Sequence, residues 1–220
     1  MSANNTHKNF SPHFRNTTRS LPTGRRRNTQ ALISNGITKS CTCRLTMEDY
    51  IRKILIRYGH PAPCKPQRST HQHHKIIYGT SIQKPLEEDT SHRLDAAGIK
   101  HIQGIFGMVL YHARAVNNKL LTNLSSIGSE QAKATQATNK AANHLLEYLA
   151  TYPNDGITYR FSNMVLATHS NAAHLNETRA CSRSGSHIFS YNNYPTPRKN
   201  VPVLSLAQII NVVMSSSSEA

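Results

Sequence analysis

The chain has 220 residues and a formal net charge of +15, because 26 Lys and Arg residues stand against 11 Asp and Glu residues. Hydrophobic residues make up 37%, which is low for a globular chain of this length and indicates that part of it is not packed into a core. The sequence offers neither a run of about 18 apolar residues nor a secretory signal, which excludes a membrane-spanning helix and favours an intracellular location, cytoplasmic or nuclear.

The basic residues are concentrated near the N-terminus. Residues 1–68 hold 13 basic and two acidic residues. This gradient indicates a polyanionic partner, and RNA or DNA is the usual one; the alternative is a solvated basic tail without a dedicated partner. Residues 1–40 have too few apolar side chains to offset the entropy of ordering, so we expect a disordered basic tail. Its triplet Arg25, Arg26 and Arg27 is a candidate phosphate-contacting or nuclear-targeting run, or an untargeted part of the tail.

A short helix is expected over residues 46–58. Thr46 is a suitable N-cap, and Glu48 and Asp49 would lie in the first turn, where the helix dipole favours negative charge. Apolar residues recur at helical spacing up to Tyr58, and Gly59 ends the pattern. Residues 62–93 predict an extended connection with one short strand over 76–78. Its histidines, with Cys64, have no spacing that fits a closed metal site, so no metal site is expected.

Three helices are then predicted: the first over residues 94–114, the second over 119–127 with its end at Gly128, and the third from a Ser129 cap to about 151. The first has an apolar stripe, made of Ile102, Ile105, Phe106, Val109 and Ala113. Gly98, Gly104 and Gly107 weaken the first of them, and close helix packing is the usual reason to accept such glycines. The pattern changes to strands over 157–161, 164–170 and 185–191, with a partly extended stretch over 203–214. Helices followed by strands predict an α+β protein with separate units.

Three segments, taken in order, resemble the Pol polyprotein of copia-type retrotransposons. Residues 43–51 (CRLTMEDYI) are similar to the strand and helix that follow the polymerase palm. Residues 94–153 resemble the helical connection, with 107–114 (GMVLYHAR) in place of the family's "G-x-L-L-Y-x-A-R". Residues 169–173, 182–189 and 216–220 look like the first strand, second strand and start of the first helix of the ribonuclease H domain.

The resemblance implies four parts. The tail of residues 1–40 precedes a thumb-like helix and extended connection over 41–93. A small helical connection bundle over 94–153 follows, and then an incomplete, truncated ribonuclease-H-like sheet over 157–220. Such a sheet would have uncovered faces and edges, so we expect residues 157–220 to be marginally stable or prone to aggregation.

The same resemblance implies that the catalytic carboxylates are missing. Ribonuclease H hydrolyses RNA with two Mg²⁺ ions held by acidic side chains. Asn171 occupies the position of the family's first Asp, and Ala220 falls one residue before its catalytic Glu. The Asp-Asp pair of a polymerase also does not occur. We therefore expect no enzyme activity, no cofactor and no small-molecule substrate, although the intact family would use Mg²⁺.

The remaining expectation is weak, non-specific binding of RNA or DNA. In related proteins the polymerase thumb follows the nucleic-acid backbone where this chain has Lys53, Arg57, Lys65 and Arg68. An ordinary solvated helix face is the alternative for these four. The resemblance thus implies a catalytically inactive piece of a retroelement polyprotein. The alternative is an unrelated basic structural protein of ribosomal or chromatin type, which explains the charge equally well but not the ordered segments.

Overall fold

The structure, a computed structural model, describes residues 33–35, 42–72, 87–175, 177–191, 200–210 and 212. Within them the α-helices are α1 (Tyr50–Arg57), α2 (Ala96–Val116), α3 (Leu121–Glu130) and α4 (Gln136–Thr151). Three 3-10 turns occur: η1 (Asn118–Leu120), η2 (Gln131–Lys133) and η3 (Thr178–Ala180). The strands are β1 (Ile33–Asn35), β2 (Thr42–Thr46), β3 (Gly156–Arg160), β4 (Val165–Ala173), β5 (Ser182–Tyr191) and β6 (Pro202–Ile210).

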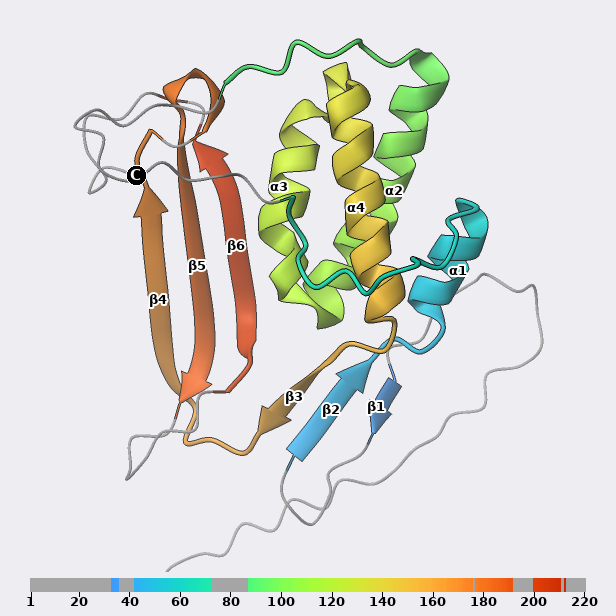
Figure 1. Cartoon of the computed structure of the whole chain (residues 1–220). Coiled ribbons are helices and arrows are strands. Elements are labelled where there is room, and N and C mark those ends of the chain that lie inside the picture. Colours follow the sequence, from blue (N-terminus) through green and yellow to red (C-terminus); the bar gives the residue numbers. More distant parts are fainter. Residues whose placement is uncertain are drawn as a thin grey trace, which may run out of the picture.

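The four helices enclose the main hydrophobic core. Fully buried side chains come from each helix and include Ile54, Ile102, Leu124 and Leu145. Burying such a side chain contributes about 1.5–3 kcal/mol, so this bundle is the main source of stability in the molecule. Figure 1 shows α2, α3 and α4 side by side, with α1 at one flank of the bundle.

Two antiparallel sheets accompany the bundle. The smaller has the strand order β1-β2-β3, and its β2 and β3 lie on either side of the whole helical bundle in the sequence. The larger has the order β4-β5-β6 and lies beside α3, with β6 nearest the helix (Figure 1). The fold is therefore α+β, as the order of helices and strands predicted.

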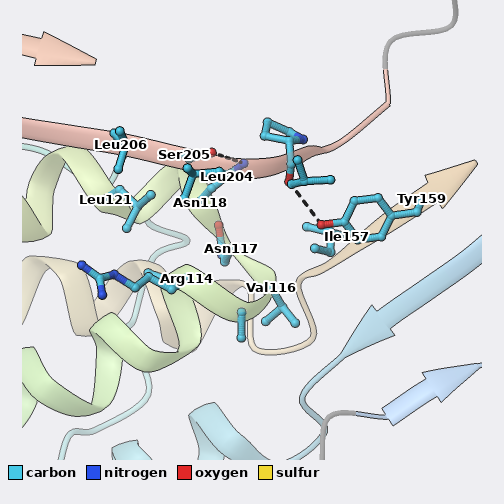
Figure 2. Close-up of a pocket in the computed structure, with 14 residues that line it drawn as sticks. Arg114, Val116, Asn117, Asn118, Leu121, Ile157, Tyr159, Leu204, Ser205 and Leu206 are labelled. Atoms are coloured by element: carbon cyan, nitrogen blue, oxygen red, sulfur yellow. Dashed lines mark hydrogen bonds between the residues drawn. The ribbon is translucent and has the colours of Figure 1, made fainter. Parts of the chain in front are cut away.

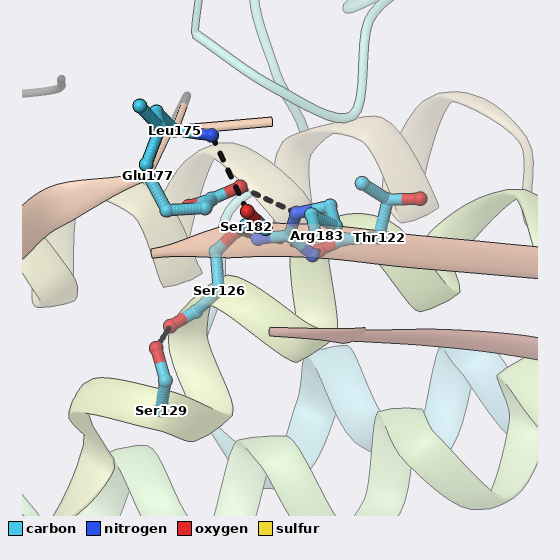
Figure 3. A network of polar contacts seen from close by, with 7 residues as sticks. All are labelled: Thr122, Ser126, Ser129, Leu175, Glu177, Ser182 and Arg183. Atoms are coloured by element: carbon cyan, nitrogen blue, oxygen red, sulfur yellow. Dashed lines mark hydrogen bonds and ion pairs between the residues drawn. The ribbon is translucent and has the colours of Figure 1, made fainter. Parts of the chain in front are cut away.

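Arg183 of β5 fastens the larger sheet to α3. Its Nε donates to Glu177 at 2.5 Å, and its two terminal nitrogens donate to the Thr122 carbonyl at 3.2 Å and the Ser126 hydroxyl at 2.7 Å. The side chains of Arg183 and Glu177 are only 12% and 17% exposed. Figure 3 shows this network between the sheet and the helix, including the bond from Ser129 to the Ser126 carbonyl. Each nitrogen of the Arg183 guanidinium therefore has a hydrogen-bond acceptor, which offsets the cost of burying its charge.

Two predicted helix starts were wrong. Thr46 does not cap α1, because it is the last residue of β2 and is buried there. The helix starts after Asp49, which has a left-handed backbone (φ 58°) and no capping bond from its side chain. Ser129 lies inside α3, and Thr135 caps α4 instead, in a reciprocal capping box with Thr138.

The glycines of the helices have different roles. A Cβ on Gly104 would lie 2.6 Å from the Tyr58 hydroxyl, so the close packing predicted for that residue is present. Gly107 has open space around it, and close packing does not explain it. Gly128 does not end α3, since the helix continues to Glu130; a Cβ there would meet the Phe106 ring at 2.7 Å.

The strand segments were predicted more accurately than their pairing. The strand expected over 157–161 is β3, but it pairs with β2 in the smaller sheet rather than joining the strands that follow it. The stretch 203–214 supplies β6 as the third strand of the larger sheet. Residues 33–35 form β1 inside the segment expected to be disordered. The rest of the tail, including Arg25, Arg26 and Arg27, and the strand expected over 76–78 lie outside the described residues.

Candidate nucleic-acid interface

The outward side of α1 is basic. Lys53 and Arg57 are both exposed on this helix, while Ile51 and Ile54 on its other side are completely buried. The guanidinium of Arg57 lies 5.9 Å from the centre of the Tyr58 ring, a cation–π distance. Burial of the apolar side therefore fixes which cations of α1 face solvent.

The chain continues from α1 as a strap over residues 60–72, which crosses the helical bundle (Figure 1). Lys65 and Arg68 are exposed along it. Gln67 between them holds the strap to α4: its backbone nitrogen donates to the Thr151 hydroxyl at 3.0 Å, and its side chain lies 3.2 Å from the His144 ring. Two predicted cations are thus displayed on either side of an anchored residue.

The far end of the strap is held to both α4 and α3. The second ring nitrogen of His144 lies 3.1 Å from the Ser69 carbonyl. Asn123 of α3, which is almost fully buried, donates to the Thr70 carbonyl. These contacts explain how a proline-containing segment without regular secondary structure keeps a defined path over the helices.

The four predicted cations are all exposed, two of them on α1 and two on the strap that follows it. We call Lys53, Arg57, Lys65 and Arg68 the basic strap surface. Burial lowers the pKa of His60, at the start of the strap. The carboxylate of Glu147 on α4 raises this pKa, but by a smaller amount. A flexible Lys or Arg on an exposed, anchored surface is suited to phosphate oxygens and carries no base specificity.

Asn171 lies elsewhere, on β4, and lines a groove between the larger sheet and the start of α3. The groove has a volume of about 350 Å³, and Lys119, Arg183 and His187 also line it. None of the described residues that line it carries a carboxylate. The side-chain oxygen of Asn171 accepts a hydrogen bond from the Ala172 backbone nitrogen at 2.9 Å.

These residues do not fit the Mg²⁺ ions that the resemblance implies. Mg²⁺ requires oxygen ligands, commonly with one or two carboxylates. Here the side-chain oxygen of Asn171 already accepts from Ala172, and the charged side chains among the described lining residues are cationic. Among the described residues no group of three or more His, Cys, Asp or Glu side chains could hold a metal ion.

A second groove, of about 280 Å³, lies between the end of α2, β3 and β6. Figure 2 shows Val116, Leu121, Ile157 and Leu204 facing it, with the bond from Asn118 to Ser205 at its rim. The Tyr159 hydroxyl donates to the Pro202 carbonyl at 3.2 Å across the groove. The described residues that line it are mainly apolar.

Sequence reasoning missed His112, the most unusual titratable side chain in the bundle. It is completely buried, and neither ring nitrogen has a hydrogen-bond partner among the described residues. Its ring stacks on Tyr50 with 5.8 Å between centres and 8° between planes. Burial lowers the pKa of His112 to about 4, against a smaller raising effect of Asp155. Its place in the apolar stripe of α2 was the only sequence signal.

Within the described residues, no helix is both long and apolar enough to cross a membrane. Comparison of the chain with protein-family models, with curated proteins and with solved structures gives no match. The resemblance to copia-type Pol polyproteins therefore stays a prediction from the sequence.

Proposed function

We propose that this chain is a catalytically inactive relative of the copia-type Pol polyprotein that retains weak, sequence-independent binding of RNA or DNA. The observation that carries the binding half is the basic strap surface: four exposed cations on α1 and on a segment anchored to α3 and α4. Such cations gain affinity by releasing counterions from the phosphate backbone, which makes binding steeply salt-dependent.

Replacing Lys53, Arg57, Lys65 and Arg68 by Gln tests the surface. Each phosphate contact adds about 0.7 to the slope of log affinity against log salt for a single strand, so the slope should become shallower by about 3. Fluorescence anisotropy with a labelled single strand, at several salt concentrations, measures this slope. If the basic tail also binds the strand, the variant with all four substitutions should keep a reduced salt slope rather than lose it completely.

The matched control replaces two other Lys and two other Arg residues by Gln: Lys100, Arg114, Lys133 and Arg160. All four are exposed, and none lies on α1 or the strap, so the net charge falls equally in both variants. If both variants lose the same slope, general charge accounts for binding and the surface has no special part. Absence of binding by the unaltered chain at low salt would end the proposal.

The proposed lack of catalytic activity rests on the groove at Asn171, where the charged side chains among the described lining residues are cationic. Incubation of the full chain with an RNA–DNA hybrid and Mg²⁺ or Mn²⁺ should leave the hybrid intact. The Asn171→Asp variant should be equally inactive, since a single restored carboxylate does not hold two metal ions. Metal-dependent cleavage above a mock preparation would contradict this part.

The runner-up, an unrelated basic structural protein, also binds nucleic acid. Translation of the genomic DNA that flanks both ends of the gene distinguishes the two. Polymerase-like and integrase-like reading frames upstream support the retroelement origin, and their absence supports the alternative.

A further inference from the structure

We propose that the groove beside Asn171 binds a phosphate group, in place of the metal ions that a ribonuclease H site would hold. The inference rests on the proposed function, because it assigns nucleic-acid phosphate as the natural source of that group. It concerns a site distinct from the basic strap surface, formed by the start of α3 and all three strands of the larger sheet.

The first argument is the hydrogen-bonding state of Asn171. Its oxygen accepts from the Ala172 backbone nitrogen, and this backbone donor fixes which end of the carboxamide is the oxygen. Within the part of the chain that the structure describes, nothing accepts from the amide nitrogen of Asn171, so its two N–H donors are left for a ligand. A position that would offer an anionic acceptor in the enzyme family here offers donors, which suit an oxyanion.

The second argument concerns His187, which lies directly across from Ser205 in the pairing of β5 with β6. Its Nδ1 is 2.8 Å from the Ser205 hydroxyl, and that hydroxyl also accepts from Asn118 at 3.2 Å. The Ser205 proton can then be donated to Nδ1, which places the proton of the neutral ring on Nε2. His187 is exposed and lines the groove, so this N–H is available to a ligand there.

The third argument is charge. Lys119 lines the groove with a side chain that is 70% exposed, and its contact with Asp155 is long, at 4.0 Å. Asp155 is 27% exposed, but at this length the pair contributes little, so the ammonium can turn to a ligand. Arg183 adds a second positive charge to the lining, although Glu177, Thr122 and Ser126 already take up its donors. Charge-assisted bonds from Lys119 with neutral donors from Asn171 and His187 match the oxygens of a phosphate.

Titration of the full chain with inorganic phosphate, at constant ionic strength and followed by NMR, tests the site. We expect saturable shifts of the Asn171 side-chain amide and the His187 ring, and no saturable shift there with Mg²⁺. Non-saturable or scattered shifts with phosphate, or saturable shifts with Mg²⁺, would overturn the proposal.

Two variants sharpen the result. Lys119→Gln should weaken phosphate binding at least threefold. Lys100→Gln should not, because it removes an exposed Lys of α2 that is not among the residues lining the groove. Asn171→Asp should abolish phosphate binding, because it places a negative charge in the groove. Unchanged phosphate affinity in Lys119→Gln or in Asn171→Asp, with the amide spectrum showing an intact fold, would contradict the assignment.

A short single strand separates the sources of phosphate. Its competition with inorganic phosphate at the groove supports a nucleic-acid backbone as the ligand, and failure to compete at saturating concentration rejects that source. The variant lacking the basic strap surface keeps the groove and should still bind inorganic phosphate. If the groove does not bind phosphate while the chain still binds a single strand in a salt-dependent way, only this inference is rejected. If the groove binds phosphate but the chain does not bind a single strand, the proposed function is rejected instead.

Discussion

At the scale of single residues, burial decides the chemistry more than residue type does. His112 shows this most clearly, because an imidazole that is ordinarily partly charged near neutral pH is completely buried and stacked on Tyr50. The apolar stripe of α2 was predicted correctly from Ile102, Ile105 and Val109, all of which are buried. The spacing of His112, three residues after Val109 and seven after Ile105, places it on the buried side of the helix. Spacing could not show that its ring nitrogens would have no hydrogen-bond partner among the described residues.

His112 makes stability depend on pH. Its pKa in the folded chain is about 4 and in the unfolded chain about 6.5, so between these values only the unfolded chain binds the proton. The free energy of unfolding should therefore be unaffected by this group above pH 6.5 and fall as the pH drops toward 4, by roughly 3 kcal/mol in all. Urea unfolding at pH 7 and pH 5 measures the loss.

The His112→Phe variant is the control, because it keeps a planar ring and has no proton to bind. Compared with the unaltered chain, it should lose less stability between pH 7 and pH 5. Equal losses in the two proteins would show that other groups cause the acid sensitivity.

At the scale of elements, the sequence predicted where helices and strands lie far better than what they pack on. The three strands β4, β5 and β6 follow from alternation and turn residues, but nothing local showed that Arg183 would reach α3. The basic strap surface was predicted as a set of four residues. Its anchors, Gln67, Asn123 and His144, were not, because each contact joins residues far apart in the sequence.

The two Arg–Glu pairs found among the described residues differ in burial and allow a matched test. Arg183→Met leaves Glu177 without its partner in a mostly buried position and should lower the free energy of unfolding by about 2–4 kcal/mol. Arg179→Met breaks the pair with Glu88, whose two side chains are 78% and 64% exposed, and should cost less than about 1 kcal/mol. Urea unfolding of both variants compares them; equal costs would mean that Arg183 does not fasten the sheet.

At the scale of the whole molecule, stability is unevenly distributed. The bundle holds nearly all of the fully buried side chains, whereas the larger sheet contributes only Phe189 and Ser182 to the buried set. Several large apolar residues of the sheet and its connections are exposed, including Phe161 (73%), Met164 (78%) and Leu166 (69%). β4 lies at the sheet edge, and its segment Val165–Ala173 has no charged Lys, Arg, Asp or Glu to discourage pairing with another chain.

The Leu166→Lys variant should aggregate more slowly than the unaltered chain at equal stability, because a charge on an edge strand opposes intermolecular pairing. Light scattering during mild heating follows aggregation, and urea unfolding checks that stability is unchanged. Ile56→Lys is the control, since Ile56 is equally exposed (71%) but lies on α1. A similar slowing in both variants would attribute the effect to added charge in general rather than to the edge.

The pairing of β2 with β3 places Thr46 opposite Gly156, where the chain leaves for the bundle and returns from it. The bundle is thus inserted between two neighbouring strands, and its folding brings their ends together. Were it to unfold, the two strands would be the ends of a long flexible loop, and closing such a loop has an entropic cost that grows with its length. Slow hydrogen exchange at the amides of β2 and β3 would therefore report that the helices between them are folded.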